Sequence, residues 1–199
     1  MPCCLVGSEM CIRDRYLFGT KGSMALSYLR DRGLTLNTIR EFKLGLSPSK
    51  NDELIIFLKE EGYEEHYIEK AGLAFKPENR PLVDRFRNRV MFPISNLDDR
   101  VVAFGGRSLD TSYGAKYINS AETKVFKKGS LLFNLRNAQK NNRNNSLLIV
   151  EGYMDVITLA NNSINNVVAP LGTALTKEQL QLVWRVSEEP ILLLDGDNA

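Results

Sequence analysis

The 199-residue chain lacks the residues on which several common kinds of site depend. Its single histidine, His66, argues against a histidine-based zinc site and against a Ser-His-Asp triad. Its three cysteines, Cys3, Cys4 and Cys11, lie within the first eleven residues, so they cannot form a disulfide framework for the rest of the chain. No run of about 18 apolar residues occurs, and we therefore expect no membrane span.

The composition, 43% hydrophobic and 25% charged, is that of a folded protein and argues against wholesale disorder. The overall charge of +2 hides an uneven distribution along the chain. Residues 80–143 hold 13 basic and 5 acidic residues, whereas residues 144–199 hold 2 basic and 7 acidic ones. The basic middle is either a surface that binds a polyanion or a solvated charged face, and charge alone leaves both interpretations open.

The first fifteen residues, MPCCLVGSEMCIRDR, show no clear periodicity and lack the basic start and apolar stretch of a signal peptide. A zinc site would need a fourth ligand, and no further Cys or His lies nearby. We interpret residues 1–15 as a foreign or artefactual leader. The expected domains are then residues 16–145 and residues 146–199, separated by the polar, Asn-rich stretch 140–145.

The first expected domain is an α+β lobe of short helices and an antiparallel hairpin. Ser23 and Thr35 are candidate helix caps, and glycines end the helical segments. The helices are expected at 24–32, 36–43, 52–61 and 64–71. Two strand-like segments, 89–94 and 100–106, flank the turn sequence Asn-Leu-Asp-Asp at 96–99, which predicts a hairpin.

After Ser146, short apolar runs alternate with helical patterns. The runs cover 147–150, 166–169 and 191–194, and the helices are expected at 153–160 and 177–186, the latter capped by Thr176. This alternation predicts an α/β domain with a parallel sheet.

Acidic residues directly follow two of these strands. Glu151 follows the first strand, and Asp195 and Asp197 follow the third. Ligands of open α/β sheets bind at the carboxyl ends of the strands, where these three carboxylates would repel one another. Either one of them keeps its proton, or a divalent cation neutralises them. An all-oxygen ligand set without histidine favours Mg²⁺ or Mn²⁺, and the basic neighbourhood suggests phosphoryl or nucleotidyl transfer.

Several segments resemble the DnaG-type bacterial primase core and its Toprim domain. The core resemblance lies in 87–94 (RNRVMFPI), 103–107 (AFGGR), 116–123 (KYINSAET) and 126–129 (FKKG). The Toprim resemblance lies in 151–156 (EGYMDV), 171–174 (LGTA) and 195–197 (DGD). The segments follow one another in the family's order from about Tyr16 to the last residue.

The resemblance implies a DNA primase, a DNA-directed RNA polymerase that makes short RNA primers on single-stranded DNA from ribonucleoside triphosphates. It implies a cytoplasmic bacterial protein of the replication fork, with the replicative helicase as partner of a C-terminal domain. It assigns metal binding to Glu151, Asp195 and Asp197, and catalytic roles to Glu151 and to Asp155 as an accessory acid. The residues that it assigns to nucleic-acid or nucleotide contact are Arg89, Arg107, Lys116, Tyr117 and Lys128.

The sequence also departs from the family pattern. The N-terminal zinc module, the end of the Toprim domain and the helicase-binding domain are not found, so zinc is not expected here. We therefore expect a fragment whose third Toprim strand is an exposed edge, poorly stable and weakly active or inactive alone. The alternatives are another Toprim enzyme, such as a topoisomerase or nuclease, a phosphatase with Asp195 as nucleophile, or a nucleic-acid-binding module without activity.

Overall fold

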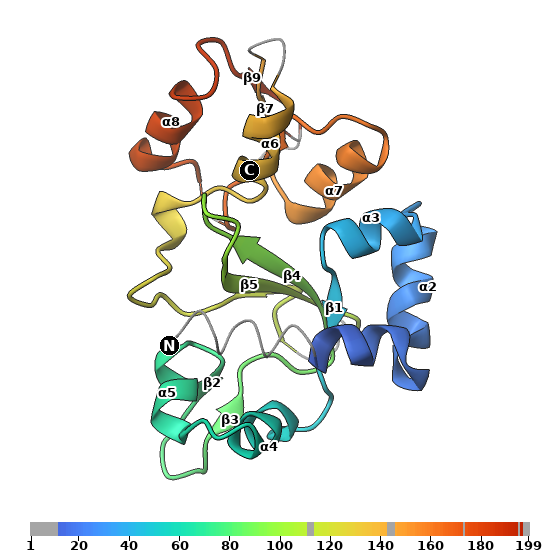
Figure 1. The fold of residues 1–199 in the computed structure, drawn as a ribbon, viewed down its shortest axis with the longest axis vertical. Coiled ribbons are helices and arrows are strands. Elements are labelled where there is room, and N and C mark those ends of the chain that lie inside the picture. The colour runs from blue at the N-terminus through green and yellow to red at the C-terminus, as the bar shows by residue number, and fades with distance from the viewer. Residues whose placement is uncertain (1–11, 111–113, 143–145, 173, 195, 197–199) are drawn as a thin grey trace.

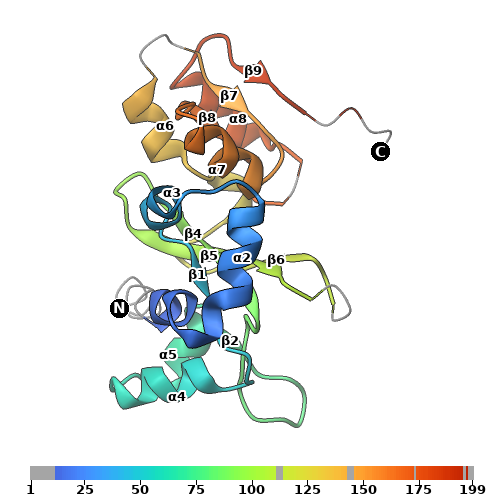
Figure 2. The ribbon, with the colours of Figure 1, turned by 90° about the vertical axis from the view of Figure 1, so that its right-hand side faces the viewer.

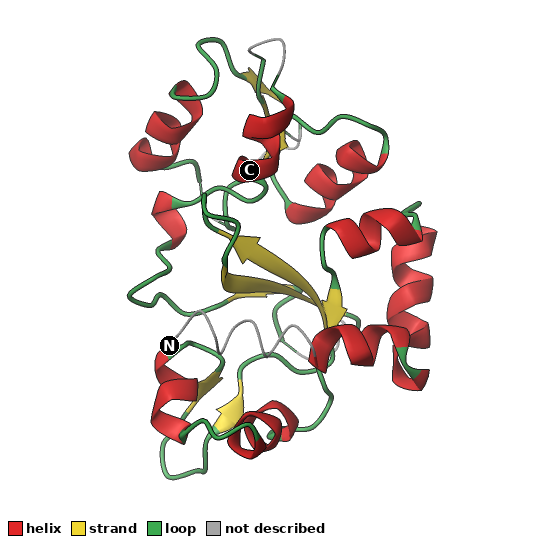
Figure 3. Ribbon diagram, in the orientation of Figure 1, coloured by secondary structure: helices red, strands yellow, loops and turns green. Residues whose placement is uncertain are grey.

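The computed structural model describes residues 12–110, 114–142, 146–172, 174–194 and 196. Viewed from the side, the chain forms three tiers: a small helical tier, a middle antiparallel sheet with flanking helices, and a tier built on a parallel sheet (Figure 2). Figure 3 shows how helices surround the central strands. Within these described ranges, no helix has the length and apolar character that a membrane crossing requires.

The predicted short helices are present with small shifts at their ends. They are α2 (Ser23–Asp31), α3 (Leu36–Glu41), α4 (Glu53–Glu60) and α5 (Glu65–Lys70), preceded by the 3₁₀ turn η1 (Thr20–Gly22). Thr35 caps α3, because its Oγ1 accepts a hydrogen bond from the Thr38 amide at 3.2 Å. The cap expected at Ser23 is wrong: Gly22 holds the N-cap position of α2, and no side chain caps it.

Residues 12–15, which we had set apart with the leader, belong to a helical stretch that covers 12–18. Ile12 and Arg13 are buried, and the Arg13 guanidinium lies 4.0 Å from the centre of the Phe104 ring. Their burial against the sheet explains why they are ordered despite the lack of a clear sequence period. The three cysteines lie outside the described residues.

The middle sheet has the strand order β1-β4-β5-β6 and is antiparallel throughout. Its strands are β1 (Gly45–Leu46), β4 (Arg89–Ser95), β5 (Val101–Ser108) and β6 (Tyr117–Asn119). The predicted hairpin joins β4 to β5, and its turn is closed by Asn96, whose Oδ1 accepts hydrogen bonds from the amides of Asp98 and Arg100, both at 3.0 Å. A separate two-stranded sheet pairs β2 (Ala74–Phe75) with β3 (Val83–Asp84).

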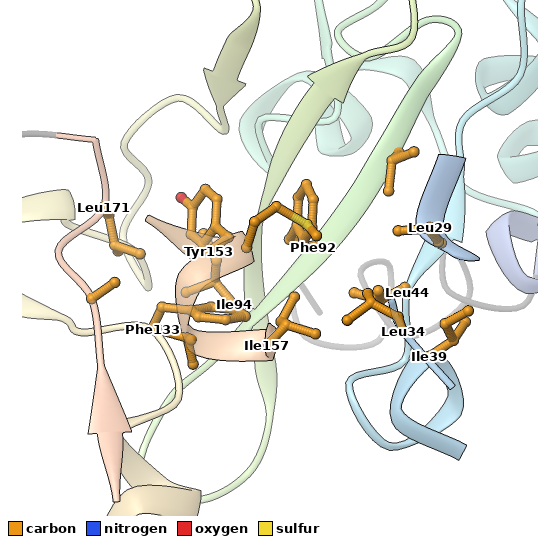
Figure 4. Close-up of a cluster of buried hydrophobic side chains, with 14 of the residues drawn as sticks. Leu29, Leu34, Ile39, Leu44, Phe92, Ile94, Phe133, Tyr153, Ile157 and Leu171 are labelled. Carbon is orange, nitrogen blue, oxygen red and sulfur yellow. The ribbon is translucent and has the colours of Figure 1, made fainter. Parts of the chain in front are cut away.

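Strand β4 is buried on both faces and separates two hydrophobic cores. Phe92 and Ile94 face a core that extends through α2 and α3 into the parallel-sheet tier. Met91 faces a second core, under α4 and α5. Figure 4 shows the first core, where side chains from both halves of the chain interdigitate. This shared core ties the two halves together, because separating them would expose apolar surface to water.

The parallel sheet confirms the α/β prediction. It consists of β7 (Leu148–Ile149), β8 (Val167–Val168) and β9 (Ile191–Leu192) in the order β8-β7-β9, with α7 (Tyr153–Asn161) and α8 (Lys177–Trp184) as connections. The third strand, β9, is an edge strand among the described residues, and the side chains of Ile191 and Leu192 are 47% and 57% exposed.

A segment from before the Asn-rich stretch also packs on the parallel sheet. Helix α6 (Leu135–Asn141) shares a core with β7 and β8. Phe133, just before it, exchanges backbone hydrogen bonds with Ala169 beyond β8. The chain therefore crosses to the upper tier in Figure 1 shortly after the 3₁₀ turn η2 (Lys128–Ser130), ahead of residue 140.

Candidate active-site cleft

A cleft of about 730 Å³ opens where β6 faces the N-terminal end of α7. The middle tier contributes Arg32 at the end of α2, Arg85 after β3, residues 116–119 and Lys128. The parallel-sheet tier contributes residues 151–155, Pro170 and Gly172. Segments far apart in the sequence thus form one concave surface, with cations from one half and carboxylates from the other.

The two described acids of the predicted site both line this cleft. Glu151 directly follows β7, and Asp155 lies in the first turn of α7. Asp155 Oδ2 accepts a hydrogen bond from the Gly152 amide at 2.9 Å, so this carboxylate also holds the turn that carries Glu151. Both side chains are exposed to the cleft, where a carboxylate can meet a ligand in water.

The other two predicted metal ligands, Asp195 and Asp197, lie outside the described residues. Among the residues that are described, no group of three His, Cys, Asp or Glu side chains is close enough to hold a metal ion. The donor chemistry of Glu151 and Asp155 is nevertheless of the kind that Mg²⁺ takes, since both offer hard carboxylate oxygens at the carboxyl end of a parallel strand.

Lys116, Tyr117 and Lys128 line the basic side of the cleft. Lys116 and Tyr117 precede and begin β6, and Lys128 begins the η2 turn. Burial raises the pKa of the Tyr117 phenol, which therefore stays neutral near pH 7. Two ammonium groups and an aromatic face together suit a phosphate and a base of a nucleotide.

Arg89 and Arg107, predicted as contact residues, do not line the cleft and are nearly buried. Arg89 Nη1 donates a hydrogen bond to the Ala115 carbonyl at 2.9 Å, and burial lowers the pKa of its guanidinium. The Arg107 guanidinium lies 4.1 Å from the centre of the Tyr28 ring and 5.8 Å from that of Tyr117. Both arginines thus support the β6 side of the cleft from behind.

Arg85 and Arg32 line the cleft but were not among the predicted contact residues. Arg85 donates from Nε and Nη2 to the Asn119 carbonyl, at 2.9 and 2.8 Å, and burial lowers its pKa. In the sequence, arginines alternate at 85, 87 and 89, which in an extended segment puts them on one face, but the chain bends at Asn88, where φ is +50°. Because of this bend, Arg85 lines the cleft whereas Arg89 does not.

Asn119 and Tyr153 also line the cleft; both lie in segments that resemble the family, but neither was predicted as a site residue. The Tyr153 hydroxyl donates to Asn119 Oδ1 at 2.6 Å, and its ring stacks on Phe92 with the centroids 5.3 Å apart. Burial raises the pKa of Tyr153 far above its usual value, so its hydroxyl keeps its proton. The hydrogen bond between Asn119 and Tyr153 joins residues 34 positions apart, and no local sequence pattern predicts such a contact.

Comparison with known protein families gives two matches that follow each other along the chain. Residues 13–139 match the DNA primase catalytic core, N-terminal domain, and residues 145–199 match the Toprim domain. The DNA primase of Clostridium acetobutylicum is 46% identical over 187 residues, a match that covers 93% of this chain and 31% of the relative. The chain thus spans about a third of the length of that protein.

Solved structures of primases share the fold. The DnaG primase catalytic domain bound to single-stranded DNA superposes with a TM-score of 0.89 at 38% identity, covering 99% of this chain and 62% of that one. The RNA polymerase domain of Mycobacterium tuberculosis primase DnaG, in complex with a double-stranded DNA with a 6-nucleotide overhang, gives a TM-score of 0.92 at 30% identity, with 98% and 64% covered. The chain therefore belongs to the DnaG primase family, with the N-terminal domain of the catalytic core followed by Toprim sequence.

Proposed function

We propose that the cleft takes part in template-directed synthesis of short RNA primers on single-stranded DNA. The observation that carries the proposal is that carboxylates of the parallel-sheet tier and cations of the middle tier line one cleft, in a chain of the primase family. Related structures hold single-stranded DNA or double-stranded DNA with an overhang, which supports DNA as the ligand of this cleft.

The basic side of the cleft is proposed to bind phosphates. Lys116, Lys128, Arg32 and Arg85 offer cationic donors to the phosphates of a template or of an incoming ribonucleoside triphosphate. Tyr117, 40% exposed, offers a ring face on which a base can stack. Arg89 and Arg107 are proposed to act on the ligand only by supporting this surface, because they are buried behind it.

The acidic side is proposed to carry the reaction centre. Glu151, Asp195 and Asp197 would hold Mg²⁺, and Asp155 would keep the Glu151 turn in place through the Gly152 amide. When bound, Mg²⁺ would supply Lewis-acid activation of a primer 3′-hydroxyl and neutralise charge at the α-phosphate. The residues of the cleft would align that hydroxyl with the α-phosphorus, so that the new P–O bond forms as the bond to pyrophosphate breaks.

The partners follow from this reaction: a single-stranded DNA template, ribonucleoside triphosphates, the RNA primer and, for a longer chain of this family, the replicative helicase. A protein with this activity would act in the bacterial cytoplasm. Residues 1–199 alone are expected to bind single-stranded DNA and to incorporate ribonucleotides weakly or not at all, because β9 is an exposed edge strand among the described residues.

The test is ribonucleotide incorporation on a single-stranded template by the complete reading frame that contains these residues. Glu151→Gln is expected to lower incorporation by about 100-fold or more, since it removes a charged ligand, while DNA affinity changes by less than about twofold. Glu178→Gln, an exposed acid at the start of α8, is the matched control and should leave incorporation unchanged. DNA cleavage or relaxation without incorporation would refute the proposal and favour another Toprim enzyme.

A further inference from the structure

Asn119, at the end of β6, is hydrogen-bonded to three separate segments that line the cleft. Its side-chain Oδ1 accepts the hydroxyl of Tyr153, and its Nδ2 donates to the Leu171 carbonyl at 2.8 Å. Its backbone carbonyl accepts both hydrogen bonds of Arg85. One residue thus contacts the start of α7 and the turn after β8 in the parallel-sheet tier, and Arg85 on its own, basic side of the cleft.

The surroundings are shaped to allow this contact. Gly172 has φ +74°, and a Cβ there would lie 3.0 Å from Asn119 Nδ2. A Cβ at Gly105 on β5 would lie 2.6 Å from the Tyr153 ring. A side chain at Gly172 would displace the Asn119 amide, and one at Gly105 would displace the Tyr153 ring. Because both residues are glycines, the middle tier and the parallel-sheet tier can approach closely here.

The Tyr153 ring is held in the same place by the core. It lies beside Phe92 in Figure 4, and Phe133 meets it edge-on with the centroids 4.9 Å apart. Packing against Phe92 and Phe133 fixes the plane of the ring, and the hydrogen bond to Asn119 Oδ1 fixes the orientation of its O–H group. Glu151 and Gly152 immediately precede this anchored ring.

We propose that Asn119 is a positioning residue that aligns the acidic side of the cleft with its basic side. Its side chain holds the Glu151–Tyr153 turn and the Leu171–Gly172 turn, and its carbonyl holds Arg85, so the spacing between carboxylate and guanidinium depends on one residue. The identity of the ligand that uses this spacing rests on the proposed function. The alignment of the two sides by Asn119 does not depend on that function.

Hydrogen exchange of the 199-residue chain, without ligand, tests the alignment. Asn119→Ala should speed exchange by about fivefold or more in peptides that cover Tyr153 and in those that cover Leu171 and Gly172, because each segment loses a hydrogen bond. Tyr153→Phe removes only the hydroxyl and should affect the first segment alone. Asn119→Asp keeps the acceptor for Tyr153 but loses the donor, and should affect the second segment alone.

Asn162→Ala is the matched control, since that exposed amide donates to the Thr158 carbonyl of its own helix, at the other end of α7. It should leave both cleft segments as protected as in the parent chain. Unchanged protection of both segments in Asn119→Ala would overturn the inference. Faster exchange throughout the chain, including α4 and α5, would also overturn it, because Asn119 would then be needed only for folding.

Binding of Mn²⁺, followed by electron paramagnetic resonance, is a separate measurement. Asn119→Ala should weaken Mn²⁺ binding by about fivefold through the displaced Glu151 turn, and Asn162→Ala should not. If the parent chain binds no Mn²⁺, the proposed metal site fails while the exchange experiment still decides the role of Asn119. If Mn²⁺ binds and Asn119→Ala binds it equally well, the alignment does not extend to the carboxylate and the inference is overturned.

Discussion

The side-chain amide of Gln179 holds the backbone of Lys128, a cleft residue 51 positions earlier. Gln179 Nε2 donates to the carbonyls of Lys128 and Leu131, at 3.0 and 2.8 Å, while Gln179 Oε1 accepts the Thr176 amide at 3.0 Å. Gln179 is fully buried. The capping box of α8 therefore also fixes the η2 turn that brings Lys128 to the cleft.

Gln179→Leu should destabilise the chain strongly. The leucine has a similar size but leaves two part-buried carbonyls without this donor, and each such loss costs about 1–3 kcal/mol. We expect the free energy of unfolding, measured in urea, to fall by about 2–4 kcal/mol. Gln181→Leu, an exposed position on the same helix, should change it by less than about 0.5 kcal/mol. Equal effects at the two positions would show that the buried hydrogen bonds do not matter.

Asp84 should make stability depend on pH. It is fully buried, and burial raises its pKa to about 6, although its carboxylate accepts hydrogen bonds from the amides of Leu54 and Ile55 at 2.9 and 3.1 Å. In the unfolded chain its pKa is about 4, so the folded state binds the proton more tightly. The stability that this carboxyl contributes is complete below about pH 4 and is lost as pH rises through 6, by about 3 kcal/mol in all.

The measurement is the free energy of unfolding between pH 4 and pH 7.5, compared with Asp84→Asn. The asparagine amide stays neutral, so the free energy of unfolding of the variant should match that of the parent near pH 4. As pH rises, the variant should become more stable than the parent. Subtracting the two curves removes the titration of the other carboxylates. A constant difference across this range would mean that Asp84 ionises with an ordinary pKa.

Cleft lysines and buried arginines should differ in the salt dependence of single-stranded DNA binding. Lys116→Ala removes an exposed cation, and the slope of log affinity against log salt should shrink by about 0.7. Arg107→Gln should weaken binding with little change in slope, since Arg107 packs on Tyr28 behind the cleft. Lys70→Ala, in α5 of the far tier, is the control and should alter neither quantity. A reduced slope for Arg107→Gln would place its guanidinium on a phosphate.

The edge strand β9 should drive self-association. Four consecutive apolar side chains at 191–194 are 47–58% exposed, and in the described part of the chain nothing pairs with the outer edge of β9. Leu192→Lys places a charge on this edge and should shift the chain toward monomer in sedimentation velocity. Leu97→Lys, at an exposed leucine of the β4–β5 turn, should leave the distribution as it was. Identical distributions for all three proteins would exclude β9 as the contact.

Local chemistry made the helices and the hairpin predictable. A threonine at position 35 caps a helix wherever the following residues can be helical, and Asn96 closes a tight turn with its own side chain. The alternation of apolar runs and helices after Ser146 likewise predicted the parallel sheet, because helices that connect parallel strands cover the faces of the sheet. For the same reason the position of Glu151 at a strand end was foreseeable.

The cleft itself could be predicted only in part. Lys116, Tyr117, Lys128, Glu151 and Asp155 were expected from family resemblance and do share it, and their proposed roles remain predictions. Arg85 and Arg89 looked alike in the sequence, yet the bend at Asn88 sends one into the cleft and the other into the interior. Neither Asn119 nor Gln179 was singled out as a site residue, because the contacts by which they shape the cleft join them to residues more than 30 positions away.

The sequence by itself thus determined the helices of residues 23–70, the β4–β5 hairpin, the parallel sheet with its connecting helices and the family resemblance, since hydrophobic period, caps and turn residues act over a few positions. Only the tertiary structure decided which cations reach the ligand and which residues hold the two sides of the cleft in place. The physical reason is that burial and hydrogen-bond partners are properties of the packed chain, and identical side chains acquire different roles from the surfaces they meet.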